Sequence, residues 1–129
     1  MAFAKSFTDL VVWQEGHKFV LAVYKATSKF PRSESFGLAS QIQRAAVSIT
    51  SNITEGFERG SNKELRQFLV IARGSLAETQ NQLLIARDLG YITNSDFSKL
   101  ADQSVVIHKL INAFRASLSK PANERTSNK

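Results

Sequence analysis

The sequence of 129 residues contains no cysteine, only two prolines and only six glycines. Without cysteine, neither a disulfide framework nor a thiolate metal site can form. The longest uninterrupted apolar run, residues 19–24, is too short to cross a bilayer, and residues 1–9 lack the apolar stretch of a secretory signal. We therefore expect a cytoplasmic protein that does not span a membrane.

Patterns that hold phosphate or metal are also missing. Gly56 and Gly60 are not followed by the lysine and hydroxyl residue of a nucleotide-binding loop. His17 and His108 have no metal-ligand companion at a useful spacing, and the Glu-x-x-His pairs of di-iron bundles do not occur. We interpret His17 as an edge of the core and His108 as a surface residue. The sequence thus predicts no cofactor, no bound metal and no enzymatic activity.

The prolines and glycines fall at the joints between four long segments with helical periodicity. Apolar residues recur at three- and four-residue spacing, which predicts helices at about residues 9–29, 35–57, 61–88 and 94–118. Such helices are about 30 to 40 Å long, and short joints favour antiparallel neighbours. The expected fold is all-α, one antiparallel up-and-down four-helix bundle over residues 1–118. Residues 119–129 form a polar tail that we expect to be disordered when free.

The expected core follows the apolar rows, and helix ends follow capping residues. Ser61 and Glu64 form a capping-box pattern, the polar cluster at residues 93–96 offers caps, and Gly90 permits a left-handed turn. The core rows are Val12, Trp13, Phe19, Val20, Val23, Tyr24, Ala26, Phe30; Leu38, Ile42, Ala45 or Ala46, Ile49, Ile53; Leu65, Phe68, Leu69, Ala72, Leu76, Leu83, Ala86; Phe97, Leu100, Ile107, Leu110, Ile111, Phe114, Leu118.

Apolar residues outside these rows indicate more surface than one bundle can bury. They are Val11, Val70, Ile71 and Ile85. A contiguous exposed apolar surface marks an interaction site, so we expect side-by-side homo-oligomers.

A polar stripe follows the second expected helix at three- and four-residue spacing. Its members are Gln41, Arg44, Ser48, either Ser51 or Asn52, and Glu55. We expect the stripe either to line a subunit contact or to pack polar groups against the third helix. Both interpretations are preferred to a catalytic role. Glu78 is expected to pair with Arg44 across the bundle, because a half-buried guanidinium needs a carboxylate to offset its desolvation.

Basic residues gather on the first and third helices of a chain whose formal net charge is +6. Lysine and arginine at helical spacing can follow a phosphate backbone, so these are the candidate nucleic-acid contacts. The candidates are Lys18, Lys25, Lys29, Arg32, Arg59, Lys63, Arg66 and Arg73. An ordinary charged surface is an equally good reading of the same residues.

The chain resembles the four-helix-bundle proteins encoded within intervening sequences of bacterial 23S ribosomal RNA. The resemblance covers about residues 7–118 and depends on an ordered set of stretches, none diagnostic alone. One departure is Gln43, where the family often has a second basic residue beside Arg44. The matching stretches are 7–14, 24–31, 37–38, 41–42, 44–49, 52–53, 55–56, 68–69, Ala72, 74–76, Glu78 and 89–92.

Proteins of this kind are also similar to the accessory variability determinant of diversity-generating retroelements. That resemblance implies a homopentameric ring, a basic surface for nucleic acid and a protein partner. It implies no enzymatic activity.

Three functional hypotheses follow from the residues and the resemblance. The first is a homo-oligomer, a pentamer by analogy, that binds RNA or DNA weakly and with little sequence preference. The alternative is a protein-interaction scaffold with no nucleic-acid role. A hydrolase using Glu55, Glu78 or His17 is the weakest, because their spacing assembles no base, nucleophile and anion hole.

Overall fold

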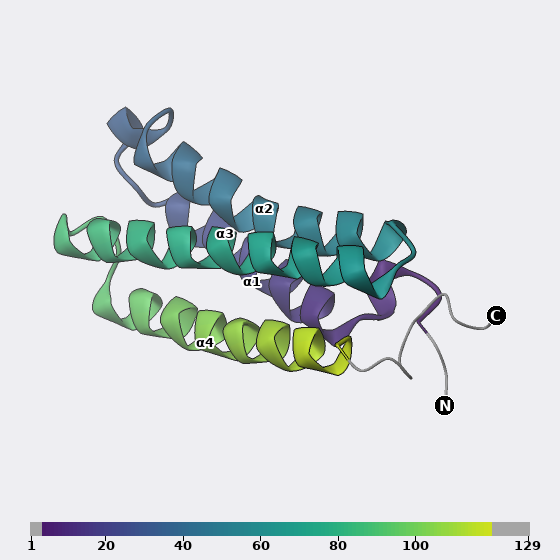
Figure 1. Ribbon diagram of the computed structural model, residues 1–129. Helices are drawn as coiled ribbons and strands as arrows, with labels where there is room; N and C mark the ends of the chain where they lie inside the picture. Colours follow the sequence, from purple (N-terminus) through teal and green to yellow (C-terminus); the bar gives the residue numbers. More distant parts are fainter. Residues whose placement is uncertain (1–3, 120–129) are drawn as a thin grey trace.

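The protein is a bundle of four α-helices in the computed structural model, which describes residues 4–119 (Figure 1). The long helices are α1 (Val11–Thr27), α2 (Leu38–Glu58), α3 (Asn62–Asp88) and α4 (Asn94–Ser117). Two short 3-10 helices, η1 (Phe7–Asp9) and η2 (Arg32–Glu34), precede α1 and α2. Within residues 4–119 there is no strand, so the predicted all-α class is confirmed. All but one residue of the polar tail predicted at 119–129 lies outside the described part of the chain.

The predicted capping residues begin and end the helices. The Ser61 hydroxyl accepts a hydrogen bond from the Glu64 amide at 3.2 Å, and the Thr93 hydroxyl accepts one from the Asp96 amide at 3.1 Å. Each satisfies an amide that has no partner inside the first helical turn. Gly90 has a φ of 79°, the left-handed conformation that glycine adopts at low cost.

The start of α1 differs from the expected start near residue 9. Ser6 caps η1 through a hydrogen bond from the Thr8 amide, and the Asp9 carboxylate accepts bonds from the Lys5 and Ser6 amides. These bonds hold Phe7–Asp9 as a separate turn, so α1 begins only at Val11. The sequence pattern did not separate the two elements because their apolar residues continue one row.

The core forms where the four helices face one another. Phe19, Ile49, Leu69 and Ile111 have no exposed surface, which places one residue from each helix at the centre. The predicted core residues are buried or half-buried with one exception. Tyr24 has 46% of its surface exposed, so its assignment to the core was wrong. It lies on the outer flank of α1, where its hydroxyl can reach water.

Glu34 links the α1–α2 connection to the α3–α4 connection. One Glu34 carboxylate oxygen accepts a hydrogen bond from the Leu38 amide at the start of α2, at 3.0 Å. The other accepts one from the Tyr91 hydroxyl on the α3–α4 connection, also at 3.0 Å. The Tyr91 and Phe30 rings lie 5.7 Å apart. One carboxylate thus caps a helix and joins two connections that are distant in sequence.

None of the helices in the described part of the chain is suited to a bilayer. Among these residues, no helix combines the length and the apolar character that crossing a membrane requires.

Candidate nucleic-acid interface

The predicted basic residues lie in two groups towards opposite ends of the bundle. Figure 1 shows the end of α1 at one end and the α2–α3 turn at the other. The first group comes from α1 and the connection after it: Lys18, Lys25, Lys29 and Arg32. The second surrounds the α2–α3 turn and the first half of α3: Arg59, Lys63, Arg66 and Arg73. The structure therefore offers two separate basic surfaces.

In the first group, two lysines are paired with carboxylates. Lys18 lies 3.1 Å from Glu15, and Lys29 lies 3.3 Å from Asp96 of α4. The lysine side chains stay 67% and 61% exposed, and exposed ion pairs of this kind contribute less than about 1 kcal/mol. No other ion pair between described residues involves this group, so Lys25 and Arg32 have no carboxylate partner there.

In the second group, Arg59 is the most constrained side chain. It lies 3.1 Å from Glu55 and 3.5 Å from Glu64, and its guanidinium stands 5.0 Å from the Phe68 ring centre. A phosphate would have to compete with both carboxylates for it. Lys63 and Arg66 have no carboxylate partner among the described residues. They are therefore freer than Arg59 to contact a phosphate.

Cations of α4 were missed by the sequence reasoning. Arg73 donates a hydrogen bond to Asn112 of α4 at 2.9 Å, which brings the second group next to α4. Arg115 lies one turn beyond Asn112, and Lys109 lies one turn before it. Nothing in the sequence says which helices are neighbours, so these residues were not grouped with Arg66 and Arg73. The absence of acidic residues from 103 to 119 was the available signal.

The polar stripe of α2 meets α3 through Ser48. The Ser48 and Ser75 hydroxyls are 2.8 Å apart across the two helices. Asn52 donates to the Ser48 carbonyl at 2.8 Å and to its hydroxyl at 3.0 Å. Of the two preferred interpretations, packing against the third helix accounts for Ser48, whereas Asn52 bonds within α2. Glu55 instead pairs with Arg59 on the exposed surface.

The expected ion pair between Arg44 and Glu78 does not form. Both side chains are exposed and line a shallow hollow of about 240 Å³ together with Gln41 and Ser48. Neither takes part in an ion pair among the described residues, and Glu78 accepts only a long hydrogen bond from Gln82 at 3.4 Å. The prediction was wrong because Arg44 keeps its water contacts, which removes the need for a buried counter-ion.

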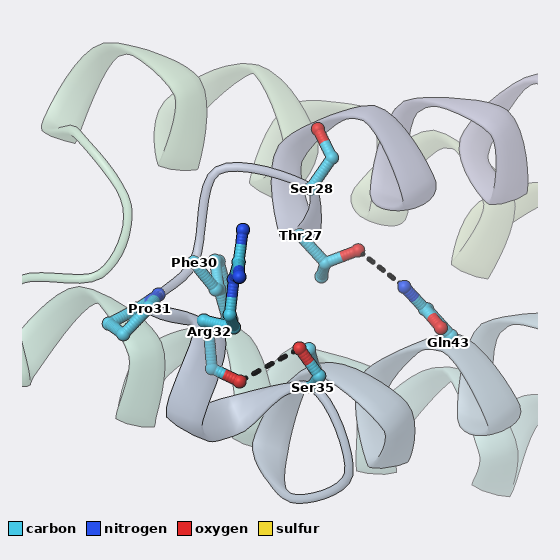
Figure 2. Close-up of a pocket in the computed structure, with 8 residues that line it drawn as sticks. Thr27, Ser28, Phe30, Pro31, Arg32, Ser35 and Gln43 are labelled. Carbon is cyan, nitrogen blue, oxygen red and sulfur yellow. Dashed lines mark hydrogen bonds between the residues drawn. The ribbon is translucent and has the colours of Figure 1, made fainter.

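A second hollow, of about 400 Å³, lies between the end of α1 and the start of α2 (Figure 2). Gln43 donates a hydrogen bond to the Thr27 hydroxyl at 2.9 Å across it, and Ser35 donates to the Arg32 carbonyl at 2.9 Å. Figure 2 shows the Arg32 side chain extending from η2 towards the end of α1. The polar groups near Arg32 bond within the chain, so the hollow presents one cation and no converging set of free donors.

The two histidines lie on different helices, His17 on α1 and His108 on α4. His17 is exposed and stacks on Trp13 with ring centres 4.7 Å apart, so it lies farther from the core than expected. His108 is exposed on α4, as predicted. Among residues 4–119, no three histidine, cysteine, aspartate or glutamate side chains are grouped to hold a metal ion.

Comparison with known protein families identifies the family of this chain. Residues 8–113 match the family described as 23S rRNA-intervening sequence protein. The chain belongs to this family. The resemblance inferred from the ordered stretches of sequence is thereby confirmed. No match is found among curated proteins.

The family assignment agrees with a solved structure. The chain is similar to the crystal structure of a protein with unknown function from the S23 ribosomal protein family of Bacteroides thetaiotaomicron VPI-5482. The TM-score is 0.77 with 24% sequence identity, and the match covers 84% of this chain and 98% of that chain. At this identity, the likeness establishes the fold alone.

Gln43 of α2 makes a polar contact with α1. The Gln43 amide reaches the buried Thr27 hydroxyl of α1, which in turn donates to the Val23 carbonyl at 2.9 Å. In this member of the intervening-sequence protein family, the position joins α1 to α2 and adds no charge.

Proposed function

We propose that the protein is a non-enzymatic bundle that associates with copies of itself and binds RNA or other nucleic acid in the cytoplasm. The observation that carries the proposal is a set of cations with no carboxylate partner among residues 4–119, on a chain of net charge +6. Among the predicted candidates, these are Lys25, Arg32, Lys63, Arg66 and Arg73. Phosphate contacts carry no direct sequence information, so we expect little sequence preference.

Neighbouring helices run antiparallel in the proposed arrangement. Along α3 the residue numbers rise from Arg73 to Gln80, and their hydrogen-bond partners on α4 fall from Asn112 to Ser104. Between α2 and α3, Ser48 meets Ser75 while the connection at residues 59–61 is short. These pairs support the up-and-down order.

Self-association is supported by apolar residues on the outer face of α3. Ile71 and Ile85 are 51% and 42% exposed, and Glu78 lies midway between them at seven-residue spacing. Seven residues are close to two helical turns, so the three share one face. Arg44 and Glu78, both unpaired in the single chain, could each pair with the opposite charge on a second copy. This face is therefore the proposed subunit contact.

The pentameric ring follows from the family resemblance, and it would strengthen weak binding. A ring presents each basic surface five times by that analogy, and linked sites gain avidity without any new contact. The proposed phosphate contacts are individually weak, so assembly and binding are expected to be coupled.

The non-enzymatic part of the proposal is supported by what the candidate catalytic groups contact. Glu55 is held by Arg59 at 3.1 Å, and His17 stacks on Trp13. Glu78 is exposed and accepts from Gln82. These contacts give structural roles to the groups that a hydrolase would need as acid or base.

A protein-interaction scaffold is the second candidate, and two exposed apolar residues favour it. Phe36, in the connection between α1 and α2, is fully exposed, and Leu89 at the end of α3 is 57% exposed. Exposed apolar side chains are typical of protein contacts. A specific protein partner whose binding needs Phe36, with no uptake of RNA, would favour this candidate.

Light scattering coupled to size exclusion tests the proposal. Protein verified free of nucleic acid is run at low and high salt, alone and with a hairpin RNA. The proposal predicts an oligomer that takes up RNA at low salt and releases it at high salt. A monomer, or an oligomer that ignores RNA at both salt concentrations, would contradict it.

A further inference from the structure

Four polar side chains are spaced regularly along the side of α3 that faces α4. Arg66, Arg73, Gln80 and Arg87 are each seven residues apart, about 10 Å along the helix. Arg73 bonds Asn112 at 2.9 Å, Gln80 bonds the Ser104 hydroxyl at 2.9 Å, and the Arg87 guanidinium lies 4.9 Å from the Phe97 ring centre. The row therefore lies along the boundary between α3 and α4, which we call the α3/α4 seam.

One half of this seam is basic on both sides. Arg66 and Arg73 come from α3, while Lys109 and Arg115 come from α4. In Figure 1 the start of α3 and the end of α4 lie at the same end of the bundle, and the bond from Arg73 to Asn112 joins the two helices in this half. The Arg115 Nε atom is shielded from solvent and has no hydrogen-bond partner in the described structure. Its guanidinium keeps its remaining donors for a ligand.

Carboxylates are absent from this half of the seam. No aspartate or glutamate occurs between Glu64 and Glu78 on α3, or between Asp102 and Ser119 on α4. At the other half, Arg87 is paired with Asp88 at 3.0 Å. Carboxylates also neutralise part of the charge of the α1 group, since Lys18 and Lys29 each pair with one. The half with Arg66 and Arg115 is therefore the surface with the least internal neutralisation.

The seam also lacks an exposed phenylalanine, tyrosine or tryptophan ring among the described residues. Among described residues, the phenylalanine and tyrosine side chains with more than a third of their surface exposed are Tyr24 and Phe36, and neither belongs to α3 or α4. Proteins that bind single strands stack bases on exposed rings. The seam instead has a row of basic residues flanked by Val70 and Val105, which are 38% and 48% exposed. Such a row suits a double helix, in which the bases are turned inwards and the phosphates face out.

We propose that the α3/α4 seam around Arg66, Arg73, Lys109 and Arg115 binds the phosphodiester backbone of a double-helical nucleic acid. This inference rests on the proposed nucleic-acid function and assigns it to one of the basic surfaces. It places the main contacts on residues 109 and 115 as well as on α3, and it gives the α1 group a minor part.

A pair of matched double variants tests the assignment. Arg66→Gln with Lys109→Gln changes the seam, and Lys18→Gln with Lys25→Gln changes the α1 group. Each removes two cations and leaves a formal net charge of +4, from +6 less two, so general attraction is equal. Circular dichroism melting establishes that both variants stay folded. Fluorescence anisotropy then measures binding of a hairpin RNA stem, a DNA duplex of the same sequence and a single-stranded RNA over a range of salt.

The seam variant is expected to bind both duplexes about tenfold more weakly at low salt. The slope of log K against log salt should fall in magnitude by about 0.9 for each lost contact. The α1 variant should stay within about twofold of the unmodified protein with an unchanged slope.

Other outcomes separate the inference from the proposed function. If the unmodified protein binds but the two variants lose equal affinity, or if it prefers the single strand, the seam assignment is overturned while nucleic-acid binding stands. A strict requirement for the RNA duplex would also overturn it, because phosphates alone do not distinguish the two duplexes. If the unmodified protein binds none of the three probes, the proposed function fails as well.

Discussion

Gly56 of α2 and Phe68 of α3 lie so close that no other side chain fits at position 56. A Cβ atom on residue 56 would lie 2.7 Å from the Phe68 Cβ and 3.0 Å from the Leu65 Cδ1. The Phe68 Cβ is bonded directly to the backbone of α3, so it cannot move aside without a shift of that helix. The two helices owe their close approach at this end of the bundle to the absence of one side chain.

Gly56→Ala should therefore destabilise the fold. Overpacking of this kind costs about 1–3 kcal/mol in the free energy of unfolding, measured by urea denaturation. Gly74→Ala is the matched control, because Gly74 is exposed in α3 and an alanine methyl group there would meet nothing within 4 Å apart from its chain neighbours and the local helix backbone. That control should gain about 0.5–1 kcal/mol. Equal effects of the two substitutions would contradict the packing described for α2 and α3.

Two residues of the polar stripe of α2 are expected to contribute differently to the stability of the fold. Asn52→Ala removes the bonds to Ser48 and should cost about 1 kcal/mol of unfolding free energy. Arg44→Met should change stability by less than about 0.5 kcal/mol, because Arg44 is exposed and unpaired in the single chain. Thermal melts of both variants at a concentration that keeps the protein monomeric test this. A large loss of stability for Arg44→Met would indicate that Arg44 pairs with Glu78 and would contradict the structure described above.

Tyr91 makes stability depend on pH in the alkaline range. Its hydrogen bond to Glu34, then partial burial, then the Glu34 charge raise the pKa of the Tyr91 phenol above its usual 10.0. The folded state thus holds this proton more tightly than the unfolded state. The stabilisation is complete below the unfolded pKa and is lost as pH rises through the folded pKa.

Tyr91→Phe removes both the bond and its pH dependence. The variant should be less stable than the unmodified protein at neutral pH, and the difference should shrink as the pH rises above about 10. Tyr24→Phe serves as the control, since Tyr24 is exposed and donates no hydrogen bond within the described chain. A difference between Tyr91→Phe and the unmodified protein that stays constant with pH would refute the role of this phenol.

Self-association should depend on the outer face of α3. Ile71→Glu places a charge beside Glu78 on that face and should dissociate the oligomer, as measured by light scattering. Leu21→Glu is the matched control on α1, with 57% exposure against 51% for Ile71. If Leu21→Glu dissociates the oligomer and Ile71→Glu does not, the subunit contact lies on the other side of the bundle.

The helices were predictable because their signals are local. Apolar spacing marks the buried rows, and Ser61, Thr93 and Gly90 act within a few residues of the helix ends that they fix. The turn at Ser6 and Asp9 was missed because its bonds form between side chains and amides while the apolar row continues. Tyr24 was misplaced because periodicity gives the row of a residue but not the width of the buried face.

The candidate interface was only partly predictable because it depends on which helices are neighbours. Arg66 and Arg73 could be grouped from their seven-residue spacing along one helix. Arg115 could not be joined to them, because its place beside Asn112 and Arg73 exists only after α3 and α4 have packed. The Arg44–Glu78 prediction failed for a related reason, since sequence does not reveal how much of Arg44 stays in water.

The affinity for a hairpin RNA as a function of salt is the most direct test of the central claim, that this protein binds nucleic acid through phosphate contacts. Each phosphate contact releases counterions, so log K should fall linearly with log salt. With several cations engaged, we predict a steep decline and no dependence on the base sequence of the stem. Binding that is insensitive to salt, or that varies strongly with sequence, would contradict the claim.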